Sequence, residues 1–374
     1  MIKIGIITYH APYNFGSTLQ AYATQEKLNS FGYVIEIVNY RMLPQKEAYS
    51  LIRKNSGKRE FLLDLEQLPV FPQKRKRGQR FEKFFNSYLN LTQEFADPEQ
   101  FQALSANYNV MISGSDQIWN KESNELHGSD WKYMMPYLLN GFNGKKVSYA
   151  SSIGNSTQED LLHIAPYISS FDHIAMREDS SAEIISKLLD RDVETVIDPT
   201  LLLTRDEWIQ KLGLQKSHAE KPYVLFYSLT GFRPFRRGEG LLKKIADQGY
   251  QVKFITPYFN YPWHDKRFVN VISYGPIEFI KSLYNAETII TDSFHGTIFS
   301  INMGKKFYSI NGQNASDFRK TDILKKLGLM NRSITWDAKY EELDKSDIDY
   351  QVVYERLAAL REHSINYLKD AIEN

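Results

Sequence analysis

The first part of the chain alternates β-branched apolar runs with amphipathic stretches. Residues 2–8 form an apolar run typical of a buried parallel strand, and residues 34–38 form the next such run. Between them, apolar residues recur at helical spacing from Leu19 to Leu28. A strand, a helix and a second strand in this order predict a right-handed crossover in a parallel sheet.

The alternation continues through most of the sequence. Further strands are predicted at 109–113, 146–152, 174–177, 194–197, 223–228, 251–255, 288–291 and 306–310, and helices at 239–247, 278–286 and 349–371. The two series of elements predict an α/β fold with two Rossmann-like domains facing across a cleft. We expect an N-terminal domain at 1–205, a C-terminal domain at 206–348 and a C-terminal helix at 349–374.

Residues 44–100 depart from this pattern. Basic residues gather at 53–59 and again at 74–77, among amphipathic stretches. We predict a helical insertion in the first domain, with a mobile basic segment at 53–77. The basic residues indicate either a peripheral contact with an anionic membrane or glycan, or only a solvated helix face or loop.

Composition and charge narrow the functional classes. The chain has 374 residues, which is too many for one compact core and suits two domains. A formal net charge of +1 is too small to attract nucleic acid over the whole surface, and we expect no nucleic acid as a partner. The absence of cysteine excludes disulfides, thiolate nucleophiles and zinc–thiolate sites.

The N-terminus favours a cytoplasmic, soluble protein. Residues 1–8 are too short and too early for the apolar region of a signal peptide, and they resemble a strand instead. No apolar run reaches the length needed to span a bilayer.

Candidate chemistry lies in the loops that follow the predicted strands, because ligands of open parallel sheets bind beyond the carboxyl ends of the strands. The first loop contains Asn14, Gly16 and Ser17 before a predicted helix. The start of such a helix offers backbone N–H groups and partial positive charge to an anion. A helix cap by Ser17 is the alternative.

The second loop, residues 113–120, combines small residues with polar side chains. Asp116 is a candidate general base for a sugar hydroxyl. Trp119 has the shape to stack on a sugar ring, but a place in the core is the interpretation we favour.

The third loop begins at Arg177. An arginine at a strand end can hold a carboxylate or phosphate in a bidentate fork. Pairing with Glu178 or Asp179 at the surface is the alternative, and the sequence leaves both open.

The fourth loop, residues 292–297, lies between a strand and a helix. His295 is suited to proton transfer near neutral pH, Gly296 allows close backbone approach to an anion, and Ser293 and Thr297 can donate to phosphate oxygens. The alternative is a helix cap with a packed histidine.

A fifth candidate is the charged segment 314–320. Arg319 and Lys320 follow a predicted strand and indicate either a phosphate clamp or a charged loop. No spacing of histidines or carboxylates resembles a metal site, and no cofactor is expected.

Several of these motifs occur in one order along the chain, and together they resemble the polysaccharide pyruvyl transferase family. The resemblance rests on residues 4–10, 14–22, 113–120, 149–154, 177–180, 198–202, 291–297 and 327–332. It therefore covers nearly the whole chain up to residue 332.

The resemblance implies a GT-B-like fold and a transferase of cell-surface polysaccharide biosynthesis in the cell envelope. It implies phosphoenolpyruvate as donor and a sugar or lipid-linked glycan as acceptor, with pyruvate attached as a ketal. The family's catalytic histidine matches His295, and a donor-binding arginine matches Arg177. Arg319 is an addition from the sequence itself.

Two other functions remain open at this stage. A GT-B-like glycosyltransferase that uses a nucleotide sugar would need a carboxylate for the ribose hydroxyls, and Glu278 is a candidate. A glycan-binding protein without turnover is the second alternative.

Overall fold

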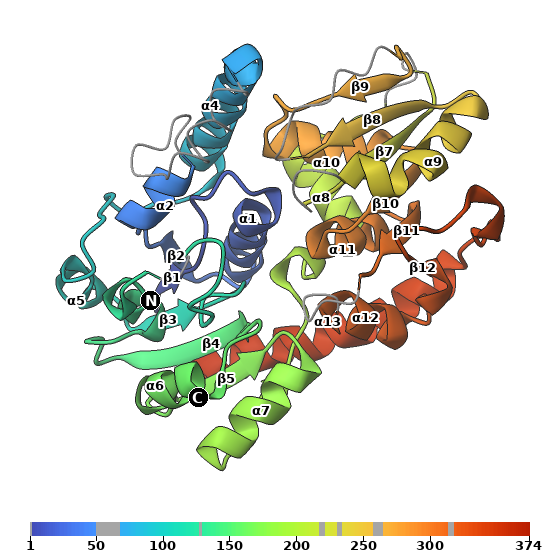
Figure 1. Cartoon of the computed structure of the whole chain (residues 1–374). Helices are drawn as coiled ribbons and strands as arrows, with labels where there is room; N and C mark the ends of the chain where they lie inside the picture. The colour runs from blue at the N-terminus through green and yellow to red at the C-terminus, as the bar shows by residue number, and fades with distance from the viewer. Residues whose placement is uncertain are drawn as a thin grey trace. The chain divides into compact units, whose positions relative to one another are not determined.

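The computed structural model describes residues 2–49, 68–126, 129–216, 221–229, 234–256, 265–312 and 318–374. The described chain divides into two compact units. The first unit takes its residues from Met1–Asn55, Lys83–Leu203 and Ala358–Asn374, and the second from Ser56–Glu82 and Thr204–Leu357. Each unit has its own parallel sheet (Figure 1).

The first unit is built on a six-stranded sheet in the order β2-β1-β3-β4-β5-β6. All of its strand pairs are parallel. The strands are β1 Lys3–Ile7, β2 Val34–Ile37, β3 Val110–Ser113, β4 Lys145–Ser151, β5 His173–Met176 and β6 Glu194–Thr195. The central strands β1, β3 and β4 are buried along most of their length, as expected where both faces of a sheet are covered.

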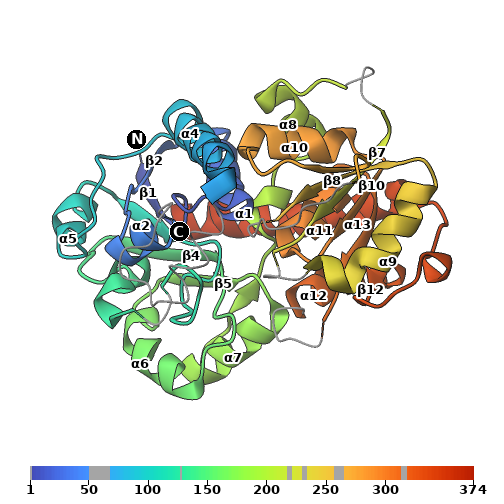
Figure 2. The ribbon, with the colours of Figure 1, turned by 45° about the horizontal axis from the view of Figure 1, so that its top comes forward.

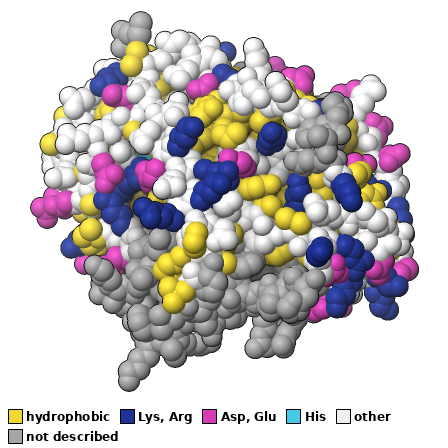
Figure 3. All heavy atoms as spheres, turned by 90° about the horizontal axis from the view of Figure 1, so that it is seen from above, with side chains coloured by type: hydrophobic (Ala, Val, Ile, Leu, Met, Phe, Trp, Pro, Cys, Tyr) yellow, Lys and Arg dark blue, Asp and Glu magenta, His cyan; other side chains and the backbone are white. Residues whose placement is uncertain are grey.

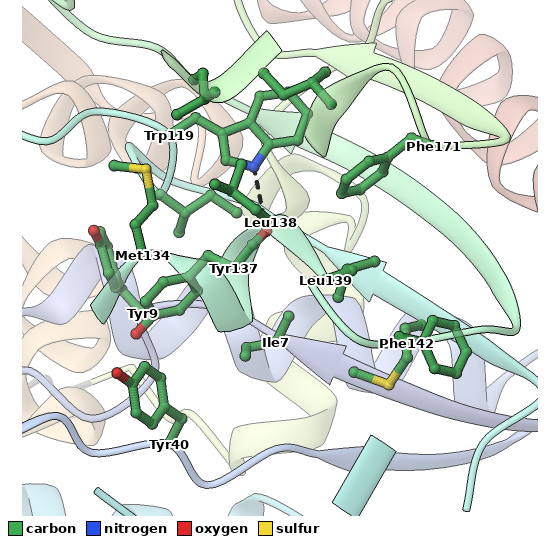
Figure 4. Packing of buried hydrophobic residues seen from close by; sticks show 14 of the residues in the cluster. Ile7, Tyr9, Tyr40, Trp119, Met134, Tyr137, Leu138, Leu139, Phe142 and Phe171 are labelled. Carbon is green, nitrogen blue, oxygen red and sulfur yellow. Dashed lines mark hydrogen bonds between the residues drawn. The ribbon is translucent and has the colours of Figure 1, made fainter. Parts of the chain in front are cut away.

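Helices complete the first unit. They are α1 Phe15–Asn29, α2 Leu43–Ala48, α5 Gln100–Ser105, α6 Gln158–Ile168, α7 Asp179–Leu189 and the last part of α13, with 3-10 turns η2 Trp131–Tyr133, η3 Met135–Leu138 and η4 Pro199–Leu201. One face of the sheet carries an aromatic core that includes Tyr9, Tyr40 and Tyr137 (Figure 4). On the sheet's β4 strand, Tyr367 of α13 donates to the main-chain oxygen of Ser148 at 2.8 Å.

The second unit repeats this plan with the strand order β12-β11-β10-β7-β8-β9, again all parallel. The strands are β7 Tyr223–Tyr227, β8 Gln251–Ile255, β9 Phe268–Asn270, β10 Thr288–Thr291, β11 Lys306–Ile310 and β12 Ser333–Ile334. Strands β7 and β10 lie at its centre, so the loops after them lie next to each other.

The helices of the second unit are α8 Arg205–Leu212, α9 Pro234–Asp247, α10 Pro276–Asn285, α11 Phe294–Asn302, α12 Phe318–Leu327 and the first part of α13 Tyr350–Glu373, with η6 Met330–Arg332 and η7 Tyr340–Glu342. Figure 2 shows α9 and α10 on opposite sides of the strands. Leu242 and Ile245 of α9 join Phe226 and Phe254 of the sheet in one buried cluster.

The inserted segment contains η1 Leu68–Val70 and helix α4 Phe71–Tyr88. The basic group 74–77, predicted to lie in a mobile segment, is part of α4. The group at 53–59 lies outside the described residues. Helix α4 is continuous, and its residues up to Glu82 are grouped with the second unit.

The predicted α/β fold with two parallel sheets is confirmed. The strand predicted at 194–197 is shorter and ends at Thr195, although the Val196 N–H still donates to the main-chain oxygen of Met176 at 2.9 Å. Strands β9 and β12 were not predicted, since three and two residues carry too little periodicity to be recognised. Among the helices that the structure describes, none is both long and apolar enough to cross a bilayer.

Candidate functional site

In the first unit, the loops after β1, β3 and β4 meet because these strands are neighbours. Asp116 lies at this point, with a backbone φ of 80°. Its carboxylate accepts a hydrogen bond from Ser17 Oγ at 2.7 Å and another from the backbone N–H of Gln117 at 2.8 Å. Its main-chain oxygen accepts from the N–H of Ser152 at 2.9 Å. Two hydrogen bonds therefore hold the side chain and a third holds the backbone of Asp116, at the carboxyl end of the sheet.

Arg177 follows β5 and brings three separate motifs together. Its guanidinium lies 2.9 Å from Glu178, 3.2 Å from Asp198 and 4.0 Å from Asp116. Only 2% of its side chain is exposed. Burial lowers the pKa of Arg177, but the carboxylates of Glu178, Asp198 and Asp116 outweigh that effect and raise it. One cation therefore faces three acidic side chains, and a further anion would be bound less readily here than a neutral group.

The loop at residues 14–17 opens α1, and Asn14 is its cap. The Asn14 side chain accepts from the N–H of Gly16 at 3.0 Å. Ser17, the alternative candidate for the cap, instead gives its hydroxyl to Asp116. Gln20 joins this loop to the loop after β3, because its amide donates to Thr8 Oγ at 2.7 Å and its oxygen accepts from Ser115 N–H at 3.3 Å.

Glu125 is a titratable residue near this site that sequence reasoning missed. It is buried, and its carboxyl oxygens are held by Tyr49 Oη at 2.9 Å and Gln45 Nε2 at 3.2 Å. Burial raises the pKa of Glu125 to about 8, and the charge of Asp116 contributes in the same direction. No feature of the sequence around Glu125 indicates a perturbed carboxyl, because its hydrogen-bond partners lie about 80 residues earlier in the chain. One is in α2 and the other directly follows it.

Trp119 lies in the core, as the sequence analysis favoured. It is fully buried, and its indole N–H donates to the main-chain oxygen of Tyr137 at 3.3 Å (Figure 4). Its ring packs edge-on against Phe171 with centroids 5.4 Å apart. It therefore stabilises the loop that carries Asp116 and offers no exposed face for stacking on a sugar.

In the second unit, the loop after β10 opens helix α11. Ser293 is the cap of this helix, and its hydroxyl accepts from the N–H of Gly296 at 3.3 Å. Thr297 Oγ donates to the main-chain oxygen of Ser293 at 3.0 Å and lies 2.9 Å from Ser309 Oγ. These hydroxyls thus hold the start of the helix on the ends of β10 and β11.

His295 lies in the first turn of α11 and is 8% exposed. Its ring is next to that of Phe294, with centroids 5.3 Å apart. The position combines a group able to transfer a proton with the positive end of a helix.

Gly296 is required by packing. A Cβ at this position would lie 2.3 Å from Thr291 Oγ and 2.9 Å from Tyr227 Cδ1. The glycine therefore lets α11 begin directly against strand β10.

Lys320 and Arg319, from α12, contribute cationic groups at the same end of this sheet. Lys320 is buried, and its Nζ donates to the main-chain oxygens of Asp292, at 2.9 Å, and Ile310. The Arg319 guanidinium lies 5.7 Å from the centre of the Phe294 ring, which precedes His295. The Asp292 carboxylate is occupied by Ser228 Oγ and the N–H of Leu229.

The structure thus gathers the predicted residues into two groups, one in each unit. Asn14, Gly16, Ser17, Asp116 and Arg177 meet in the first unit. In the second unit, Ser293, His295, Gly296 and Thr297 lie together, with Arg319 beside Phe294. Within the described ranges, no cluster of histidines and carboxylates could hold a metal ion.

Glu278, considered for a ribose, has two other partners. Its carboxylate accepts from the N–H of Gly275 at 3.0 Å and pairs with Arg80 at 3.0 Å. It therefore closes the first turn of α10 and holds α4.

Comparison with solved structures identifies the fold. A putative UDP-N-acetylglucosamine 2-epimerase from Listeria monocytogenes is similar with a TM-score of 0.58 and 10% identity, over 100% of this chain and 96% of that one. UGT89C1 of Arabidopsis thaliana, complexed with UDP-L-rhamnose, is similar with a TM-score of 0.54 and 10% identity, over 99% and 98%. At such identities the similarity shows the GT-B-like fold and nothing about the reaction.

Comparison at the level of sequence identifies the family. No curated protein sequence matches this chain. The family model described as polysaccharide pyruvyl transferase matches residues 14–314, which include the predicted site residues of both groups except Arg319. The chain belongs to the polysaccharide pyruvyl transferase family.

Proposed function

We propose that this protein transfers pyruvyl from phosphoenolpyruvate to a pair of hydroxyls on a sugar, as a ketal, in polysaccharide biosynthesis. The observation that carries the proposal is His295 in the first turn of α11, inside the family match and at the carboxyl end of a central strand. A proton donor at the positive end of a helix suits a substrate that is both anionic and activated by protonation.

The reaction requires one proton donor and two deprotonated hydroxyls. Protonation of the methylene carbon makes the central carbon of phosphoenolpyruvate electrophilic. One sugar hydroxyl adds there, inorganic phosphate leaves, and the second hydroxyl closes the ketal. Of the two hydroxyl protons, one balances the new methyl group and the other leaves with phosphate.

We assign the binding of the pyruvyl donor, phosphoenolpyruvate, to the group of residues around His295. His295 protonates the methylene carbon or contacts the phosphate. The positive start of α11, whose backbone is held by Ser293, Gly296 and Thr297, attracts the anion. Arg319 extends positive charge on the same side through its position over Phe294.

We assign the activation of the acceptor hydroxyl to Asp116, acting as general base. Hydrogen bonds from Ser17 and Gln117 hold its carboxylate in a defined orientation, which supports a role as general base. The prediction that Arg177 binds the donor stays a prediction. Its three acidic neighbours support a different role, in which Arg177 positions Asp116.

Calorimetric titration tests the assignment of the donor. We expect phosphoenolpyruvate to bind the purified chain, and His295→Ala or Arg319→Ala to weaken that binding at least tenfold. The control is His363→Ala, because His363 is an exposed histidine of the first unit. Binding of a uridine nucleotide with no binding of phosphoenolpyruvate would support the nucleotide-sugar alternative instead.

A further inference from the structure

Helix α4 carries an unusual amount of positive charge for a chain that is nearly neutral. Between Phe71 and Tyr88 it contains six basic residues and one acidic residue, Glu82, while the whole chain has a formal net charge of +1. The site described above uses none of these basic residues.

The inward faces of α4 are already packed. Phe81, Phe84 and Phe85 are buried, and the Phe84 ring lies 5.6 Å from that of Tyr22 in α1. Arg80 turns the other way, where it pairs with Glu278 and donates to the main-chain oxygen of Ser273. These contacts fix which side of the helix faces outward.

The outward side of α4 is a continuous cationic face. It consists of exposed residues at helical spacing, namely Pro72, Arg75, Lys76, Gln79 and Lys83. Three of the five are basic and none is acidic. Within the part of the chain that the structure describes, Arg75, Lys76 and Lys83 make no ion pair.

Apolar side chains lie at the N-terminal end of this cationic face. Leu68, in the turn before α4, is 50% exposed, and Pro72 is also exposed. Figure 3 shows one side of the molecule, on which hydrophobic side chains lie among groups of Lys and Arg. Lysine and arginine beside a few exposed apolar groups are typical of helices that lie on a membrane surface.

We propose that the cationic face of α4 docks the protein on a bilayer that contains anionic lipid. Each lysine or arginine near such a surface adds attraction that salt screens, and Leu68 adds a short apolar contact. With three exposed cations and one leucine, docking is weak and reversible. It does not depend on the proposed pyruvyl transfer, because the site residues are elsewhere in the sequence.

Vesicle flotation of the full chain tests this proposal. We expect the protein to float with phosphatidylcholine vesicles that contain phosphatidylglycerol, to stay behind with phosphatidylcholine alone, and to be released by high salt. The triple variant Arg75→Glu, Lys76→Glu and Lys83→Glu should lower the partition coefficient at least tenfold. Circular dichroism melts should show that it folds as the wild type does.

The matched control changes net charge equally at exposed lysines elsewhere, with Lys266→Glu, Lys325→Glu and Lys339→Glu. It should float nearly as well as the wild type. Equal losses in the two triple variants would overturn the proposal, since net charge rather than α4 would then govern binding. Failure of the wild type to float with anionic vesicles would overturn it as well.

Discussion

At the scale of single residues, the ion-pair partners of a buried charged side chain can be predicted from sequence only in part. A motif search finds Arg177 at a strand end and suggests either a donor-binding fork or a pair with its neighbours. The structure shows pairing with Glu178, but also with Asp198, which lies 21 residues later. That partner is visible only when β5 and η4 are placed in space.

Removal of the Arg177 charge should destabilise the protein strongly. Arg177→Met would leave three acidic side chains together without their cation, and breaking a buried ion pair costs about 3–5 kcal/mol. Urea unfolding followed by circular dichroism measures the effect. Arg267→Met is the control, because Arg267 forms its ion pairs at the surface and should change the unfolding midpoint little. Equal shifts for the two variants would contradict the structural role of Arg177.

Glu125 predicts a pH dependence of stability. The folded protein holds a proton on this carboxyl up to its pKa of about 8, whereas the unfolded chain releases it near 4.5. Between these values the folded state binds more protons, so stability falls as pH rises, by up to about 1.4 kcal/mol per pH unit. Glu125→Gln removes this titration.

Melting temperatures of wild type and Glu125→Gln, compared from pH 5 to pH 9, test that expectation. The melting temperature of the variant relative to that of the wild type should rise steadily with pH and become constant above about pH 8. Parallel curves across the whole range would show that Glu125 does not titrate in this window.

At the scale of elements, hydroxyl and glycine motifs were recognised as helix starts, but their contacts were only partly predicted. The sequence left open whether Ser293 caps its helix, and it does. Ser17 was a candidate cap of α1, but Asn14 caps that helix, and the Ser17 hydroxyl donates to Asp116 instead. Both loops contain several residues able to cap a helix, and only the backbone conformation decides between them.

Gly296 offers a test of how α11 packs on β10. Gly296→Ala would place a methyl group 2.3 Å from Thr291 Oγ, and overpacking of this kind costs roughly 1–3 kcal/mol. Gly240→Ala is the matched control in helix α9, where an added Cβ meets nothing within 4 Å. That change should stabilise by about 0.5–1 kcal/mol, because alanine favours a helix. Denaturant unfolding measures both, and destabilisation by both variants alike would contradict the packing argument.

At the scale of the whole molecule, the strand–helix alternation predicted two parallel sheets, and the order of motifs predicted the family. The division of the chain into two units was harder to predict, because two long helices, α4 and α13, contribute residues to both units. Residues of α4 up to Glu82 and of α13 up to Leu357 are grouped with the second unit, although the rest of each helix is grouped with the first. Periodicity identifies such helices but carries no information about the neighbours they will have.

The central claim is that a chain of this family, with His295 at the start of α11, transfers pyruvyl. The most direct measurement is mass spectrometry of glycans incubated with the protein and phosphoenolpyruvate labelled in its pyruvyl carbons. We predict a labelled pyruvyl ketal on a glycan with release of phosphate, reduced about 10²–10⁴-fold by His295→Ala and unaffected by His363→Ala. Transfer of a sugar from a nucleotide donor to the same glycans, with no labelled pyruvyl incorporated, would contradict the account.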